Sequence, residues 1–144
     1  MRFFSIFFAL LCFSIIVKAQ DAVSPDGGKY YGQVRGGIPH GKGRYVAPSG
    51  ETYEGEFRNG ELTGSGTYTR PDGGRYSGEF RNWKPNGKGR FVEPGGGVYE
   101  GDFKEGLYDG QGTLRLPSGE VLAGKWRQGS YFDEAEYRKA VVGV

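Results

Sequence analysis

The chain has 144 residues, of which 28 are glycine and 22 are Phe, Tyr or Trp. Glycine does not recur at every third position, which excludes a collagen helix, and this many aromatic residues are untypical of a disordered chain. With 19 basic and 17 acidic residues, the chain lacks the excess of Lys and Arg on which non-specific nucleic-acid binding depends.

The first element in chain order is a leader at residues 1–19. A basic Arg2, an apolar run over residues 3–17 and a small residue at Ala19 form the pattern of a secretory signal peptide. The apolar run has 15 residues, fewer than the ~20 that span a bilayer, so we predict cleavage after Ala19. The sequence therefore predicts a protein that is secreted or located in a periplasm or envelope. The alternative is an uncleaved N-terminal membrane anchor.

Removal of the leader changes the charge and the cysteine content of the mature chain. The leader contains Arg2 and Lys18 but no acidic residue, so the mature part has 17 basic and 17 acidic residues. The only cysteine, Cys12, also lies in the leader, which leaves no disulfide and no thiolate metal ligand. Residues 20–29 are expected to form a flexible lead-in.

A repeat of 23 residues dominates the rest of the chain. Each repeat opens with Tyr or Leu, has glycine two residues later, and has Val or an aromatic residue four residues later. Full repeats also carry glycines at offsets 11 and 13 and a Tyr, Phe or Leu at offset 15. A fixed period without insertions indicates tandem copies of one supersecondary unit. The units are residues 30–52, 53–75, 76–98 and 99–121, followed by a half-repeat at 122–129.

The second repeat shows how one unit folds. Residues 53–58 alternate between a ring or glycine on one face and a charged side chain on the other, which predicts a strand. Asn59-Gly60 predicts a tight turn, and residues 64–68 predict the return strand. Each repeat is therefore one hairpin, and about nine strands continue as a single antiparallel meander. Because glycine has no Cβ, rings are expected to lie over glycine backbone and to pack without a second sheet.

The pattern Tyr-x-Gly-x-Phe followed by Gly-x-Gly-x-Tyr resembles the MORN repeat (membrane occupation and recognition nexus). The resemblance extends over residues 30–129 and departs from the pattern at Val34, Trp83 and Leu122. It implies an all-β fold, an elongated single-layer sheet of tandem hairpins. Proteins of this family have been linked to acidic phospholipids, and some carry a lipid-kinase domain, which this chain lacks.

Residues 130–144 are predicted to form a short helix that caps the sheet. Asp133 and Glu136 have the spacing of a capping box at a helix start. Tyr137, Ala140, Val141 and Val144 follow the spacing of one helical face. The alternative is a frayed tail, because helices this short are marginal alone.

No catalytic, cofactor-binding or metal site is predicted. The single histidine, His40, lies at a position where MORN repeats often carry His, so we expect a structural role. The carboxylates recur with the repeat and alternate with basic residues, which is typical of a solvated sheet face. An enzyme acting through paired carboxylates is kept only as a third alternative for the function.

Two sets of residues are candidates for binding a partner. Trp83 stands where the other repeats have a turn glycine, and its ring is either tucked against a neighbouring strand or exposed as an anchor. The aromatic face supplies further candidates, and two Gly-Lys-Gly-Arg segments supply basic pairs that anionic headgroups would contact. The protein-binding set is Trp83, Tyr53, Phe57, Tyr76, Phe80, Tyr99 and Phe103; the lipid-binding set is Lys42, Arg44, Lys88 and Arg90.

The sequence predicts a non-catalytic scaffold outside the cytoplasm that binds a protein partner through the aromatic groove or by edge pairing. A second copy of this chain is one such partner. The alternative function is peripheral binding of anionic phospholipids at a membrane surface. The neutral mature chain favours a mixed-charge surface over a lipid-binding stripe.

Overall fold

The computed structural model describes residues 22–142. The predicted signal peptide at residues 1–19 and its cleavage after Ala19 lie outside the described residues. In the part that is described, no helix is long and apolar enough to cross a membrane.

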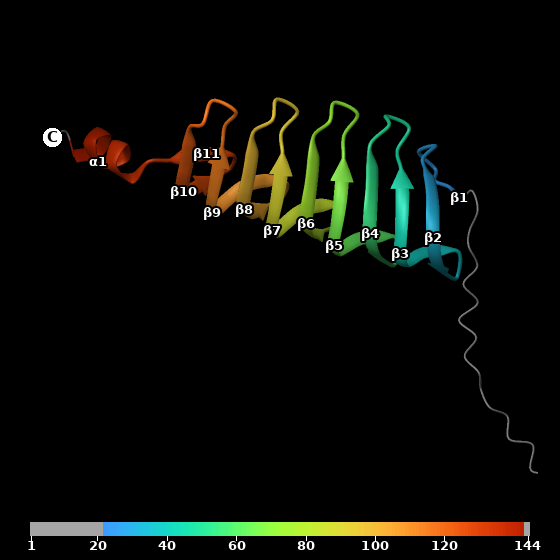
Figure 1. Cartoon of the computed structure of the whole chain (residues 1–144). Helices are drawn as coiled ribbons and strands as arrows, with labels where there is room; N and C mark the ends of the chain where they lie inside the picture. The colour runs from blue at the N-terminus through green and yellow to red at the C-terminus, as the bar shows by residue number, and fades with distance from the viewer. Residues whose placement is uncertain (1–21, 143–144) are drawn as a thin grey trace, which may run out of the picture.

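All described strands belong to one antiparallel sheet, in which every strand pairs with its neighbours in sequence (Figure 1). The all-β, single-layer meander predicted from the repeat is confirmed. Short strands at each end, β1 and β11, extend it beyond the nine strands that the repeats predict. The strands are β1 (Ala22–Val23), β2 (Lys29–Arg35), β3 (Ile38–Val46), β4 (Thr52–Arg58), β5 (Glu61–Thr69), β6 (Arg75–Arg81), β7 (Lys84–Val92), β8 (Val98–Lys104), β9 (Leu107–Arg115), β10 (Val121–Arg127) and β11 (Ser130–Phe132).

Two-residue turns join the two strands of each hairpin. Asn59 and Gly60 connect β4 to β5 with φ of 50° and 85°, the left-handed pair that matches the twist of a hairpin. The N–H of Gly60 donates to the carbonyl of Pro39 in the preceding hairpin at 2.9 Å. The same bond recurs from Gly106 to Pro85. The tip of each hairpin after the first is therefore hydrogen-bonded to the hairpin before it.

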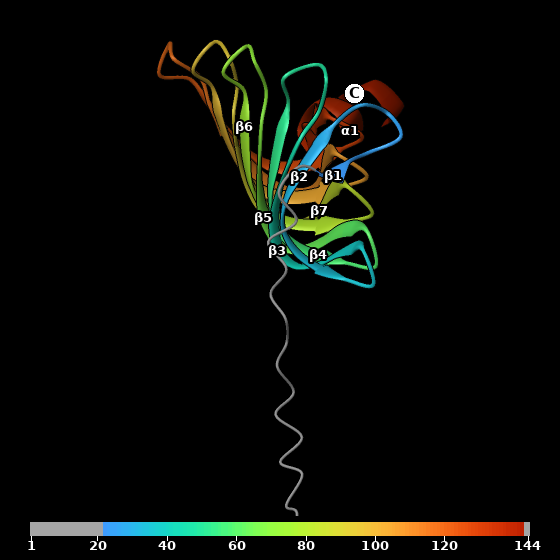
Figure 2. The same ribbon diagram turned by 90° about the vertical axis from the view of Figure 1, so that its right-hand side faces the viewer.

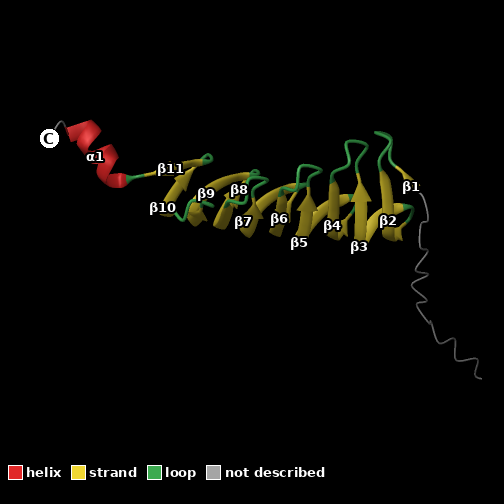
Figure 3. Ribbon diagram, turned by 45° about the horizontal axis from the view of Figure 1, so that its top comes forward, coloured by secondary structure: helices red, strands yellow, loops and turns green. Residues whose placement is uncertain are grey.

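Every hairpin bends sharply near its middle, so the sheet forms a trough whose two walls are visible end-on in Figure 2. In β7, Gly87 has a φ of 104°, which a residue with a Cβ rarely adopts. Opposite it, the pairing register shifts between Gly78 and Phe80, a bulge that increases the local twist. Because each repeat bends at the same place, the bends align, and the loops run along the long margins of the trough (Figure 3).

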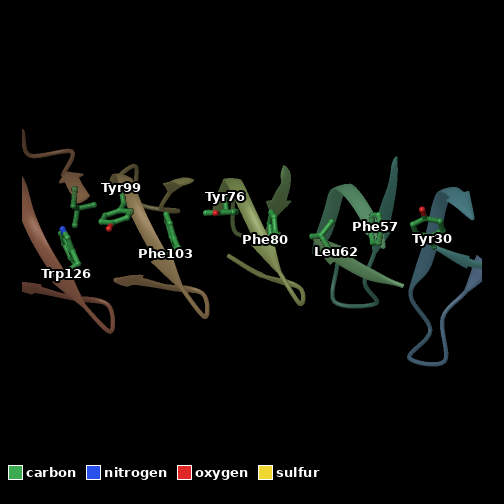
Figure 4. Packing of buried hydrophobic residues seen from close by; sticks show 9 residues of the cluster. Tyr30, Phe57, Leu62, Tyr76, Phe80, Tyr99, Phe103 and Trp126 are labelled. Carbon is green, nitrogen blue, oxygen red and sulfur yellow. The ribbon is translucent and has the colours of Figure 1, made fainter. Parts of the chain in front are cut away.

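The hydrophobic core is a row of side chains inside the bend (Figure 4). In three of the four full repeats the opening tyrosine lies over the glycine 13 residues later: a Cβ on Gly89 would be 2.4 Å from the ring of Tyr76. The hydroxyl of Tyr76 donates to the carbonyl of Glu79 at 2.7 Å. Rings over bare backbone, as predicted, therefore form the core of this single layer. The buried apolar residues are Tyr30, Phe57, Leu62, Tyr76, Phe80, Tyr99, Phe103, Leu114 and Trp126.

The C-terminal helix is present as α1 (Glu134–Val142). The carboxylate of Asp133 accepts the N–H of Ala135 at 2.8 Å, which caps the first turn. The helix continues from the end of the sheet beyond β11 (Figure 1), and its described side chains are exposed. The core at this end is instead covered by β11, whose Tyr131 ring lies 5.3 Å from that of Trp126.

Candidate functional site: the aromatic trough

The inner surface of the trough carries half-buried rings above the buried core. They come from both strands of the hairpins and from one hairpin tip, and they follow one another along the sheet. Two cavities open between them, of about 580 Å³ near the N-terminal end and about 340 Å³ in the middle. The half-buried aromatic residues packed on the core are Tyr45, Tyr53, Tyr68, Trp83, Phe91 and Tyr108.

The predicted protein-binding residues fall into two layers. Tyr53 and Trp83 line the first cavity, while Tyr76 and Phe103 form part of the second. Most of the set is almost fully buried and therefore forms the floor of the trough rather than its surface. Phe57, Tyr76, Phe80, Tyr99 and Phe103 are each at most 5% exposed.

Trp83 packs against the neighbouring strands and is half-buried, while part of its ring lines the first cavity. Its ring centroid lies 5.4 Å from that of Tyr45, 5.3 Å from that of Tyr53 and 5.6 Å from that of Phe57. All three contacts are edge-to-face, the geometry that aromatic quadrupoles favour. The side chain thus reaches back from the third repeat into the groove formed by the first and second.

The backbone of Trp83 is strained. Its φ of 66° lies in the left-handed region, where a bulky side chain costs roughly 1–3 kcal/mol. The corresponding turn position in the other repeats is glycine. Strain of this kind persists only where the surroundings stabilise it, and here the three ring contacts do so.

The second repeat departs from the others at the point where Trp83 enters. The ring of Tyr53 does not cover Gly66. A Cβ on Gly66 would instead lie 3.3 Å from the ring of Phe80. It faces Tyr68 instead, with a centroid distance of 4.7 Å, and Trp83. In this repeat the opening tyrosine therefore does not lie on the glycine 13 residues later, and the ring of Phe80 lies there instead. Tyr53 becomes part of the trough surface.

Two carboxylates lie at the rim of the first cavity. Asp26 accepts a short hydrogen bond from the hydroxyl of Tyr45, and Glu51 accepts one from the hydroxyl of Tyr68 at 2.5 Å. The bond from Tyr45 holds the pKa of Asp26 below its usual value, so Asp26 is ionised at neutral pH. Burial, followed by the bond to Asp26, raises the pKa of Tyr45 to about 12, so its hydroxyl remains a donor. The repeat pattern did not indicate Asp26 or Glu51, because neither belongs to the recurring offsets.

The four basic residues of the lipid-binding set lie on the outer face, where residues alternate with those that face the trough. All four are exposed. Lys88 forms an ion pair with Asp102 at 2.5 Å, and Arg90 forms one with Glu100 at 3.0 Å. Lys42 and Arg44 face Glu56 and Glu54 across the β3–β4 pairing. Each of these four positive charges therefore has a carboxylate opposite it.

Other polar groups have structural partners. The Nδ1 atom of His40 accepts the N–H of Asn59 at 3.4 Å, which helps to hold the turn of the next hairpin. Among residues 22–142, no three His, Cys, Asp or Glu side chains are placed together so as to hold a metal ion.

Comparison with known proteins gives one family match. A family model described as the MORN repeat matches residues 30–52, 53–75, 76–98 and 99–121, more than half of the chain. No curated protein matches the sequence.

Among solved structures, the chain is similar to the SAS-4 (dCPAP) TCP domain of Drosophila melanogaster, in complex with a proline-rich motif of Ana2 (dSTIL). The sequence identity is 14% and the TM-score is 0.37, over 72% of this chain and 70% of that one. At this TM-score the similarity supports no conclusion about the partner.

Proposed function

Because the chain belongs to the MORN repeat family, we propose that it is a non-catalytic interaction module that binds an extended segment of a protein partner along its aromatic trough. The observation that carries the proposal is the line of half-buried rings that continues across successive hairpins. Aromatic side chains are enriched at protein interfaces, because they supply large contact areas at low entropic cost. A segment lying in the trough would cover these rings one repeat after another.

The shape of the trough suits an extended chain better than a small-molecule substrate. Both cavities are open and both have Glu51 in their lining, so they lie next to one another along the trough. An enzyme site usually encloses most of its ligand and converges several polar groups on it. The groove instead presents rings and prolines over a length of several strands, which favours binding over catalysis.

The outer face gives less support for the alternative, binding of anionic lipids. The four basic residues of the lipid-binding set are interleaved with carboxylates, so these four do not form an uninterrupted positive patch. Exposed ion pairs of this kind contribute little individually and are screened by salt. A protein partner in the trough is therefore the proposal that the geometry favours.

Site-specific photo-cross-linking tests this proposal. Phe91 lines the second cavity, and replacing it with benzoylphenylalanine should yield one discrete cross-linked partner in extracts of the native cells. The same amino acid at Ser65, an exposed residue of the outer face, is the matched control and should yield no such species. Equal cross-linking from both positions, or cross-linking from Ser65 alone, would contradict binding in the trough.

We also propose that binding takes place outside the cytoplasm. The support is the composition of residues 1–19, with a basic start, an apolar run and a small residue at the predicted cleavage position. The intact mass of the protein recovered from cells checks this, and a mature N-terminus at Gln20 is the expected result. A mass that retains residues 1–19, found in the membrane fraction, would support an uncleaved anchor instead.

A further inference from the structure

The first cavity is enclosed by rings from three different segments. Tyr45 comes from β3, Tyr53 from β4, and Trp83 from the turn between β6 and β7. Their centroids lie 5.3–6.3 Å apart, and none of the three rings is parallel to another. The rings therefore meet at an angle around the cavity, rather than closing it as a flat stack.

The electrostatic character of this cavity is set by Asp26 and Glu51. Both lie in its lining, which contains no Lys, Arg or His. Their described hydrogen-bond donors are neutral: Asp26 accepts from the hydroxyl of Tyr45 and the N–H of Gly28, and Glu51 accepts from two side-chain hydroxyls. The ion pairs found within residues 22–142 all involve other residues. Neither of the two carboxylates therefore takes part in an ion pair described within residues 22–142, and the basic residue that shares a cavity lining with Glu51 is Arg70, in the second cavity.

The first cavity does not follow from the repeat pattern alone, because one of its rings, that of Trp83, stands where the repeat has glycine. The turns of the other hairpins have glycine at the same position, namely Gly37, Gly60, Gly106 and Gly129, with φ of 78–85°. Glycine adopts this conformation without strain, whereas tryptophan does not. Trp83 thus adds a ring to the wall of the cavity at a cost that the turn alone does not require.

We propose that this cavity, lined by Tyr45, Tyr53, Trp83, Asp26 and Glu51, takes a cationic side chain of the segment that binds the trough. A cation over the faces of aromatic rings is stabilised by their quadrupoles, and two carboxylates at the rim add charge complementarity. Arginine fits better than lysine, because its planar guanidinium stacks on rings and pairs with a carboxylate through two donors. This inference rests on the proposed function, since it names the chemistry of the trough's occupant.

Fluorescence of Trp83 provides a direct readout. The change Trp126→Phe leaves Trp83 as the only tryptophan, and phenylalanine is the residue at the same repeat position in Phe57, Phe80 and Phe103. The probe is a capped peptide of alternating proline and alanine with one central arginine, titrated against its citrulline counterpart, which has the same shape but no charge. The arginine peptide should bind about tenfold more tightly, and this advantage should shrink as salt rises.

Substitutions in the cavity separate charge from shape. Asp26→Asn with Glu51→Gln should reduce the arginine advantage to less than about twofold. Glu54→Gln with Glu56→Gln makes the same change of charge on the outer face of β4 and should leave the arginine advantage intact. Trp83→Gly installs the residue of the other turns, so the chain should still fold while binding of the arginine peptide, measured for this variant by isothermal titration calorimetry, weakens about tenfold.

The two proposals fail in different ways. Equal affinity for the arginine and citrulline peptides would overturn the cationic occupant while leaving binding in the trough in place. If neither peptide binds, the partner segment that cross-links at Phe91 is sequenced. A segment that has no Arg or Lys within reach of the first cavity also overturns the cationic occupant. Absence of any cross-link at Phe91 would overturn the proposed function, and this inference with it.

Discussion

Replacing Tyr99 with alanine is expected to lower the free energy of unfolding by about 3–5 kcal/mol, the usual range for a large ring removed from a core. Tyr99 is 0% exposed, and its ring stacks on that of Tyr108 at 3.7 Å. It also meets the rings of Phe103 and Trp126 edge-on at 5.1 and 5.3 Å. Urea denaturation followed by circular dichroism measures the loss.

Two further variants separate the contributions to this loss. Tyr99→Phe keeps the ring and removes only the hydroxyl, which donates to the carbonyl of Asp102 at 3.0 Å, so it should cost about 1 kcal/mol. Tyr53→Ala removes the corresponding ring of the second repeat, which is half-exposed on the trough surface, and should cost less than Tyr99→Ala. Equal losses of unfolding free energy for Tyr99→Ala and Tyr53→Ala would contradict the placement of Tyr99 in the buried floor of the trough and of Tyr53 on its surface.

The size of the expected loss follows from the architecture. A single sheet has no second layer to bury its apolar face, so most of its core must come from rings inside the bend of each hairpin. Each hairpin contacts only its neighbours, and stability is then close to a sum over repeats and their interfaces. Tyr99 lies at such an interface, since it packs on Trp126 of the following hairpin. Its removal weakens two units at once.

The strands and turns could be predicted from the sequence because their signals are local. Alternation of rings and charges in β4 and β6 fixes which face is buried, and Asn59-Gly60 fixes a turn of two residues. The family resemblance rests on the same recurring positions, and the family match covers the same four repeats. Nothing distant in the sequence is needed to find them.

The bend could not be predicted, because the two glycines of one Gly-x-Gly pattern have different roles in the structure. Gly87 turns the strand with its positive φ, while Gly89 has ordinary backbone angles and lies under a ring. The pattern Gly-x-Gly does not say which of them bends the chain. The trough depends on this difference, since a sheet that did not bend would place the rings on an open face.

The first cavity was predicted in part. The replacement of a turn glycine by Trp83 marked the position as unusual, but its contacts lie one and two repeats earlier in the sequence. They depend on how hairpin tips dock, with the N–H of Trp83 donating to the carbonyl of Leu62 at 3.3 Å. Asp26 reaches the cavity only because the lead-in turns back along Tyr45. Such contacts between units carry no periodic signal.

The second large effect is expected from adding one methyl group at Gly89. A Cβ there would lie 2.4 Å from the ring of Tyr76, which is 1% exposed and held between Phe80 and Phe103 at 5.0 and 4.8 Å. Because the ring has no free space to move into, Gly89→Ala should lower the free energy of unfolding by about 1–3 kcal/mol, the range for overpacked cores. Urea denaturation measures this change as well.

Gly95→Ala is the matched control, because a Cβ on Gly95 would meet nothing within 4 Å and its φ is not positive. The same methyl group should there change stability by no more than about 0.5 kcal/mol, or raise it slightly by restricting the unfolded chain. Restriction of the unfolded chain affects both positions alike, so a loss at Gly89 beyond the ~1 kcal/mol range of strand propensities reports the contact with the ring. If Gly89→Ala is as well tolerated as Gly95→Ala, then close packing of rings on bare backbone does not hold this sheet together.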